Sequence, residues 1–137
     1  MNEREKFIGT WRLVSFEEEQ ANGEVNFPYG EHPLGLLIYD GNGNVAVQIM
    51  SREREALPAT DFSQLDGEKV KAAISGYTAF FGTFDLDDVN RVITHHVTGH
   101  VLPGGVGKIL PRGYEFSGNR LILKPAANRR VIWERVA

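Results

Sequence analysis

The sequence predicts an all-β protein arranged as an antiparallel meander. Three observations support this prediction: short runs rich in β-branched and aromatic residues, turn residues between them at near-regular spacing, and one stretch only with helical periodicity. A parallel sheet would need a helical crossover between each pair of strands. We therefore expect neighbouring strands to be joined mainly by hairpins.

Turn signals divide the strands. The first run ends at residues 21–23, which read Ala-Asn-Gly, and the second carries Pro28, which indicates a strand end or an edge. Residues 40–44 read Asp-Gly-Asn-Gly-Asn, a strong hairpin signal because Gly and Asn tolerate the positive φ of tight turns. The expected strands, about nine in all, are residues 11–19, 25–29, 34–39, 45–50, 78–86, 91–102, 108–116, 121–124 and 130–136.

One helix of about three turns is predicted between the fourth and fifth strands. Apolar residues recur there at helical spacing, at Val70, Ile74, Tyr77 and Phe81. Asp66 is the expected N-cap, and Gly76 lies close to the expected end of the helix. Residues 51–64 are polar, so we expect them to form a long connection before this helix.

Length and composition restrict the class of protein. The 137 residues suit one domain, residues 1–137, and the absence of Cys excludes disulfides, thiolate metal sites and a cysteine nucleophile. A net charge of −3 argues against a nucleic-acid partner, which requires clustered Lys and Arg. No apolar run approaches the roughly 20 residues of a membrane span, and no secretory signal follows the N-terminus. We therefore expect a cytoplasmic protein with no nucleic-acid or membrane partner.

Motifs near the two ends of the chain indicate how the meander closes. Residues 9–11 read G-T-W at the start of the first strand, and residues 133–135 read W-E-R in the last. An up-and-down barrel pairs its first and last strands, so the indole of Trp11 can meet the guanidinium of Arg135. Such a cation–π contact contributes about 0.5 to 2 kcal/mol. We expect Trp11 and Arg135 to close one end of a barrel and to act structurally.

Five segments in order extend these motifs: FIGTWRLVSFE at 7–17, GLLIYDGNGNVAVQIM at 35–50, GYTAFFGTFDLD at 76–87, VITHHV at 92–97 and IWER at 132–135. On these segments the sequence resembles the bacterial and fungal lipocalin-like domain family of the calycin superfamily, over essentially the whole chain. The resemblance implies an antiparallel up-and-down lipocalin-like β-barrel of about nine strands with one helix covering the mouth. Many members of that family have no assigned activity. Some more distant lipocalin-like proteins in natural-product pathways act as cyclases without a cofactor.

Three of the four histidines lie on one expected strand, at His95, His96 and His100. Strand geometry puts His96 and His100 on one face but roughly 13 Å apart, so they cannot bind one metal ion unaided, and no metal site is expected. Every second residue from 93 to 101 belongs to a mainly apolar set. If this set faces inward, His95 is its one polar group. If the polar set faces inward instead, His96 lines a catalytic cavity. We favour the apolar set.

Other candidate ligand contacts follow from side-chain chemistry. Gln48 and Met50 share one face of the expected strand at residues 45–50. If that face is inward, Gln48 would anchor a ligand carbonyl or hydroxyl. Alternatively, the aliphatic face of the strand is core and Gln48 lies outside. Tyr77 and Phe81 would line the cavity if the helix aims its apolar stripe at the barrel mouth. For most aromatic residues an ordinary place in the core is the simpler explanation. The expected ligand-binding residues are His95, Gln48, Met50, Tyr77, Phe81, Tyr39 and Tyr114.

The sequence carries none of the motifs G-x-S-x-G, H-E-x-x-H or a phosphate-binding glycine loop. The leading hypothesis is therefore that the barrel binds a small, largely hydrophobic molecule and uses no cofactor. The alternative is a cofactor-independent isomerase or cyclase of small-molecule metabolism, with His95 or His96 as acid or base. A third hypothesis, an interaction module, predicts an occluded cavity and an obligate oligomer. Aliphatic positions on both faces of residues 45–50 are compatible with a homodimer.

Overall fold

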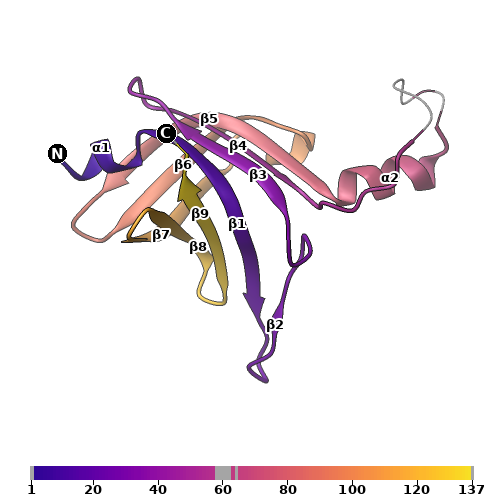
Figure 1. Ribbon diagram of the computed structural model, residues 1–137. Helices are drawn as coiled ribbons and strands as arrows, with labels where there is room; N and C mark the ends of the chain where they lie inside the picture. Colours follow the sequence, from indigo (N-terminus) through magenta and orange to yellow (C-terminus); the bar gives the residue numbers. More distant parts are fainter. Residues whose placement is uncertain (1, 58–62, 64, 137) are drawn as a thin grey trace.

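A computed structural model describes residues 2–57, 63 and 65–136 of the chain. Its strands form one antiparallel sheet in the order β2-β1-β3-β4-β5-β6-β7-β8-β9. Strand β1 also pairs with β9, which closes the sheet into an 8-stranded barrel with β2 as an extra strand (Figure 1). The predicted all-β meander is confirmed. The strands are β1 (Gly9–Glu19), β2 (Val25–Asn26), β3 (Leu34–Tyr39), β4 (Asn44–Met50), β5 (Tyr77–Asp87), β6 (Val92–His100), β7 (Ile109–Ser117), β8 (Arg120–Ala126) and β9 (Arg129–Arg135).

Strand β1 joins the two edges of the sheet. Its first residues pair with β3, and residues along most of its length pair with β9, from Trp11 opposite Arg135 to Glu18 opposite Arg129. Its last two residues also pair with β2, which lies beyond the barrel. Hydrogen bonds on both sides of β1 remove the free edges that an open sheet would expose. The closure therefore depends on residues from opposite ends of the sequence.

The turn between β3 and β4 forms as predicted. Asp40 Oδ1 accepts hydrogen bonds of 2.9 Å from the backbone N–H groups of Asn42 and Asn44. Gly43 has φ +87°, a value that glycine adopts without strain. The turn sets the register, and β3 pairs with β4 along its full length.

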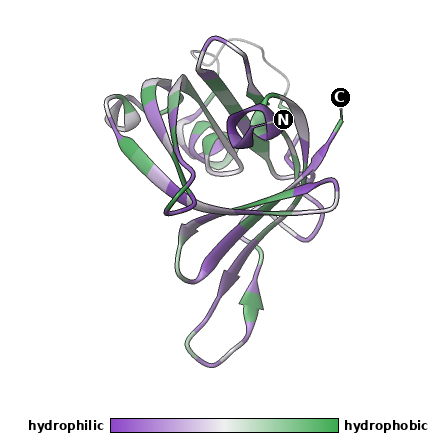
Figure 2. Cartoon of the chain, turned by 90° about the vertical axis from the view of Figure 1, so that its left-hand side faces the viewer, coloured by the Kyte–Doolittle hydropathy of each residue, from purple (hydrophilic) through white to green (hydrophobic). Residues whose placement is uncertain are grey.

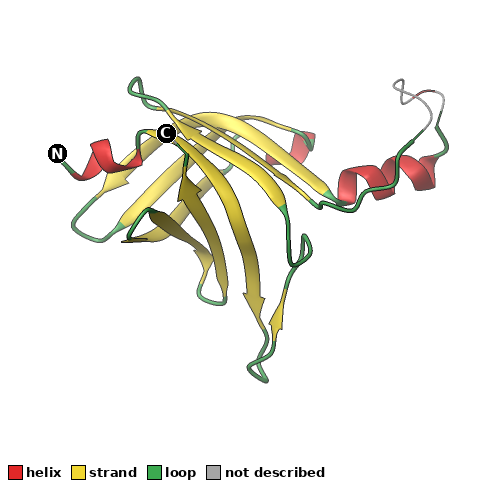
Figure 3. Ribbon diagram, in the orientation of Figure 1, coloured by secondary structure: helices red, strands yellow, loops and turns green. Residues whose placement is uncertain are grey.

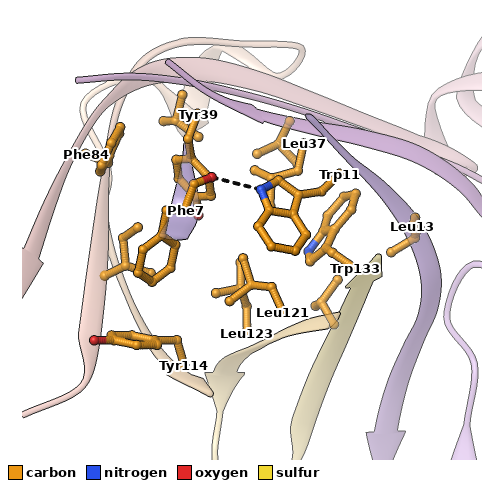
Figure 4. Packing of buried hydrophobic residues seen from close by; sticks show 14 of the residues in the cluster. Phe7, Trp11, Leu13, Leu37, Tyr39, Phe84, Tyr114, Leu121, Leu123 and Trp133 are labelled. Atoms are coloured by element: carbon orange, nitrogen blue, oxygen red, sulfur yellow. Dashed lines mark hydrogen bonds between the residues drawn. The ribbon is translucent and has the colours of Figure 1, made fainter. Parts of the chain in front are cut away.

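Helix α1 (Glu3–Phe7), which was not expected from the sequence, lies across one end of the barrel (Figure 2). Phe7 is fully buried, and its ring makes edge-on contacts with Tyr39, Tyr114 and Phe116 at centroid distances of 5.6, 4.8 and 4.9 Å. The Phe7 carbonyl oxygen accepts a 2.9 Å hydrogen bond from Nε1 of Trp11 (Figure 4). This end of the barrel is therefore filled with packed aromatic side chains.

Arg135 holds the same end together. Its guanidinium carbon lies 4.2 Å from the centre of the Trp11 ring, so the contact expected from the two end motifs is present. Nη1 donates a 2.9 Å hydrogen bond to the carbonyl oxygen of Ile8, and Nη2 donates to that of Lys6. One side chain thus links the last strand, the first strand and the end of α1.

Helix α2 (Gly67–Ser75) begins where the sequence predicts. The side chain of Asp66, the N-cap, accepts a hydrogen bond from the backbone N–H of Lys69. The helix ends one residue before Gly76, and Tyr77 and Phe81 lie on β5 instead of the helix. The helical spacing of these two residues with Val70 and Ile74 was therefore misleading, because the chain changes to strand between them.

The position of α2 differs from the expected lid. The helix extends away from the barrel beyond the ends of β4 and β5, and it buries no residue (Figure 3). An apolar stripe reduced to Val70 and Ile74 offers little surface to hold a helix across the opening. No helix in the described part of the chain is long and apolar enough to span a membrane.

Alternation along β4 shows which face of the sheet is core. Val45, Val47 and Ile49 are buried, whereas Gln48 is exposed on the outside. The aliphatic face is therefore core, one of the two alternatives that the sequence left open. A second subunit is not required to cover this face.

A β-bulge in β1 changes the side-chain phase halfway along the strand. Trp11 and Leu13 are buried, as expected for the inward face. The register against β9 then shifts between Leu13 and Ser15. Phe16 consequently continues the inward face, whereas the Ser15 hydroxyl donates a hydrogen bond to Glu17.

A second bulge lies in β6. Phe81 pairs with Gly99 and Gly82 with Val97, so Thr98 is an extra residue. The expectation that His96 and His100 share a face is wrong, because the bulge adds one residue between them and turns His100 inward. A Cβ at Gly82 would lie 1.8 Å from the His96 carbonyl oxygen, so only glycine permits this approach.

Replacing Arg135 by Met should lower the free energy of unfolding by about 1 to 3 kcal/mol, because the cation–π contact and two hydrogen bonds are lost. Chemical denaturation measures the change. The matched control is Arg130→Met: that guanidinium lies 3.8 Å from Glu17 at an exposed site, so a loss below about 0.5 kcal/mol is expected. Equal losses in the two variants would contradict the assigned role of Arg135.

Candidate functional site

The half of the barrel away from α1 contains a cavity of about 300 Å³. Its aliphatic walls come from strands β3, β4, β7, β8 and β9, at Leu37, Val47, Ile49, Leu110, Leu123 and Val131. Aromatic side chains, Phe16, Tyr29, Phe80 and Trp133, add to the lining. The polar side chains that line it are Thr78, His95, His100, Arg112 and Arg129. The cavity is thus mainly apolar with a few polar groups, which is the usual composition of a small-molecule site.

His95 lies between the cavity and the packed end of the barrel. It is 2% exposed, and its Nε2 lies 2.7 Å from the hydroxyl oxygen of Tyr39, which is 1% exposed. The expected inward set of residues 93–101 is buried at Ile93, His95 and Val97, whereas Val101, which follows the bulge at Thr98, is exposed. Nδ1 of His95 has no hydrogen-bond partner within the described structure.

Burial controls the charge state of this pair. Removal from water lowers the pKa of His95 to about 3, with smaller contributions from the positive charges of Arg112 and His96. Burial also raises the pKa of the Tyr39 hydroxyl. Both side chains are consequently neutral near pH 7, and they form a neutral hydrogen bond rather than an ion pair.

Arg112 is a cation whose charge acts on both members of this pair. It is partly buried on β7 and faces the cavity, and its one hydrogen bond in the described structure is from Nη1 to the Pro111 carbonyl oxygen at 3.4 Å. No carboxylate among the described residues forms an ion pair with it. Partial removal from water lowers the pKa of Arg112, which still leaves a guanidinium charged at neutral pH.

Several other side chains around the cavity have partners of their own. Arg129 Nε donates a 2.7 Å hydrogen bond to Glu18. The Phe16 and Tyr29 rings meet edge-on at 5.2 Å, and the Phe80 and His100 rings stack at 5.9 Å with 5° between their planes. These contacts fix side chains around the cavity and leave Arg112 as its unpaired cation among the described residues.

Four of the predicted ligand contacts lie elsewhere. Gln48, Met50 and Tyr77 line an open depression on the outer surface of the barrel, and Phe81 lines a second one with half of its surface exposed. The Phe81 ring lies over Gly99, where an added Cβ would approach its atoms to 2.4 Å. These residues take the outward face of β4 and β5, so they do not line the interior cavity.

Tyr114 and His96 also lie outside the cavity. Tyr114 is buried at the end closed by α1, where its hydroxyl donates to Glu3 at 3.0 Å and where burial and this bond raise its pKa to about 12. His96 faces outward, with Nε2 2.7 Å from Asp85. Of the sequence-predicted ligand residues, the structure brings His95 and Tyr39 together and places His95 against the cavity.

Three residues that line the cavity were not predicted to do so from the sequence: Arg112, Phe16 and His100. A signal for Arg112 was available, since it lies two residues before Tyr114 and therefore on the same face of one strand. Phe16 and His100 follow the two bulges, whose positions depend on pairing with β9 and β5. Local alternation assigns both residues to the wrong face.

Comparison with known protein families agrees with the barrel. A family model described as a lipocalin-like domain matches residues 8–136, from the residue before the G-x-W motif through the W-E-R motif. The chain belongs to the lipocalin-like domain family. No curated protein matches the sequence. Lipocalin-like barrels generally bind small molecules, and the cavity of this one lies in the barrel interior.

The pKa of His95 predicts a pH dependence for the stability of this lipocalin-like barrel. Between pH 6.5 and about 3 the unfolded chain binds a proton at His95 that the folded protein does not bind. The free energy of unfolding should therefore fall with decreasing pH, His95 contributing up to about 1.4 kcal/mol per pH unit.

Denaturation of His95→Gln at several pH values isolates this contribution, because the other titrating groups remain. We expect a shallower fall in stability below pH 6.5 than in the wild type. His96→Gln is the matched control, since that neighbour faces outward. Identical pH profiles for the wild type and His95→Gln would contradict the neutral, buried state of His95.

Proposed function

We propose that this protein binds a small, largely apolar molecule inside the barrel. The observation that carries the proposal is the interior cavity, lined by aliphatic and aromatic side chains with only a few polar groups. Burial of apolar ligand surface against such walls supplies roughly 25 cal/mol per Å². At about 300 Å³ the cavity lies at the lower end of the range for small-molecule sites, so the ligand is small.

The closed end of the barrel supports the same proposal. Phe7, Tyr39, Tyr114 and Phe116 fill that end, so a ligand would enter from the end where Phe16, Tyr29 and His100 lie. The ligand would then lie with its inner end toward His95 and Trp133.

The charge state of His95 argues against the isomerase or cyclase alternative. An efficient general acid or base has a pKa near the working pH. An imidazole with a pKa of about 3 is not protonated to imidazolium near pH 7, so it cannot act as a general acid there, and it is a weak base. His96, the other candidate, faces outward beside Asp85 and away from the cavity.

Fluorescence titration with N-phenylnaphthylamine, a neutral apolar dye, tests the proposal. Val47→Phe places extra side-chain volume inside the cavity, whereas Ala46→Phe adds the same ring on the outer face of the same strand. We expect the wild type and Ala46→Phe to bind the dye with the same affinity. Val47→Phe should bind it at least about 10-fold more weakly, which corresponds to a loss of roughly 1.4 kcal/mol of binding free energy.

Far-ultraviolet circular dichroism and thermal melting establish that each variant is folded. Thr78→Phe, at another position lining the cavity, replaces Val47→Phe if the latter does not fold. Absence of dye binding to the wild type would overturn the proposal. Equal weakening by the inner and outer substitutions would overturn it too, because the dye would then bind outside the barrel.

A further inference from the structure

Three side chains that line the cavity carry hydrogen-bond donors for which the described part of the chain offers no acceptor. The first is Arg112, whose guanidinium faces the cavity with a single 3.4 Å bond to a neighbouring carbonyl and with no carboxylate partner among the described residues. A cation partly removed from water is costly unless an opposite charge or acceptors surround it. The positive charge is therefore available to a ligand.

The second donor is the Nδ1–H of His95, which follows from its bond to Tyr39. The neutral Tyr39 hydroxyl has His95 Nε2 as its one partner in the described structure. If the hydroxyl donates to Nε2, only Nδ1–H stays unsatisfied; if Nε2–H donates instead, both the hydroxyl proton and the Nδ1 lone pair are unsatisfied. The first arrangement leaves fewer buried polar groups unpaired, so Nδ1 carries the proton.

The third donor is the indole N–H of Trp133. Trp133 is 1% exposed and lines the cavity, and its Nε1 has no hydrogen-bond partner within the described structure. An indole N–H can donate but cannot accept. Buried donors without acceptors are rare in folded proteins and often mark a place that a ligand or water completes.

We propose that the ligand is a small apolar monocarboxylate whose carboxylate group is held by Arg112, with His95 and Trp133 as further donors. This inference rests on the proposed binding function and specifies its ligand class. Carboxylate oxygens accept hydrogen bonds and form a fork-shaped pair with guanidinium. One unpaired cation fits a single negative charge, because the cavity's other guanidinium, that of Arg129, is already held by Glu18.

Calorimetric titration with octanoate and octanol tests this inference, since the two ligands share an apolar chain and differ in charge. A desolvated charged hydrogen bond corresponds to about a 10- to 100-fold change in affinity. The wild type should prefer octanoate by that factor. Arg112→Met should lose the preference while still binding octanol, and Arg112→Lys, which keeps the charge, should retain part of it.

The matched control is Arg130→Met, which removes an exposed guanidinium from the outer face of β9 and should leave the preference intact. Arg112→Gln serves as a second neutral variant if Arg112→Met does not fold. Equal affinities of the wild type for octanoate and octanol, with both weakened by Val47→Phe, would overturn the ligand class and leave the proposed function standing. Binding of neither ligand nor the neutral dye would overturn both.

Discussion

The pairing of β1 with β9 is the constraint on which the rest of the structure depends. It brings Trp11 opposite Arg135 and so creates the cation–π contact and the links to the end of α1. Phe7 can then fill one end of the barrel with aromatic packing. Because the same pairing carries the β1 bulge, it also turns Phe16 toward the other end, where the cavity lies.

The two ends of the barrel consequently differ in how their polar groups are satisfied. At the closed end the indole of Trp11 donates to the Phe7 carbonyl and the Tyr114 hydroxyl donates to Glu3. Around the cavity Arg112, His95 and Trp133 carry donors that find no acceptor among the described residues, apart from the one bond of Arg112 to the Pro111 carbonyl. A buried unsatisfied group costs about 1 to 3 kcal/mol, so under the proposed function a bound molecule that supplies acceptors would stabilise this end of the barrel.

Much of the fold follows from local sequence patterns. Alternating aliphatic residues and Asp-Gly-Asn turns predict strands and hairpins because burial on one face and positive φ are local requirements. The meeting of Trp11 and Arg135 and the inward position of His95 were likewise predictable. Helix α1 was not, because its five residues depend on the contacts of Phe7 with distant rings.

The candidate site was less predictable than the fold. Two bulges reverse the side-chain phase before Phe16 and His100, and a bulge is fixed by the partner strand rather than by the local sequence. Gln48 and Phe81 have suitable chemistry but lie on the outward face. Arg112 was predictable, because it lies two residues before Tyr114 on one strand and alternation puts both side chains on the same face.

The most direct measurement of the central claim is heteronuclear NMR of the two indole N–H groups during titration with octanoate. The protein has 2 Trp, so the signals are assigned with one Trp-to-Phe variant. The Trp133 signal should shift on binding because its donor lies unpartnered at the cavity, whereas the Trp11 signal should stay fixed by its bond to Phe7. A titration that shifts neither indole signal, or Trp11 alone, would contradict an interior binding site for carboxylates.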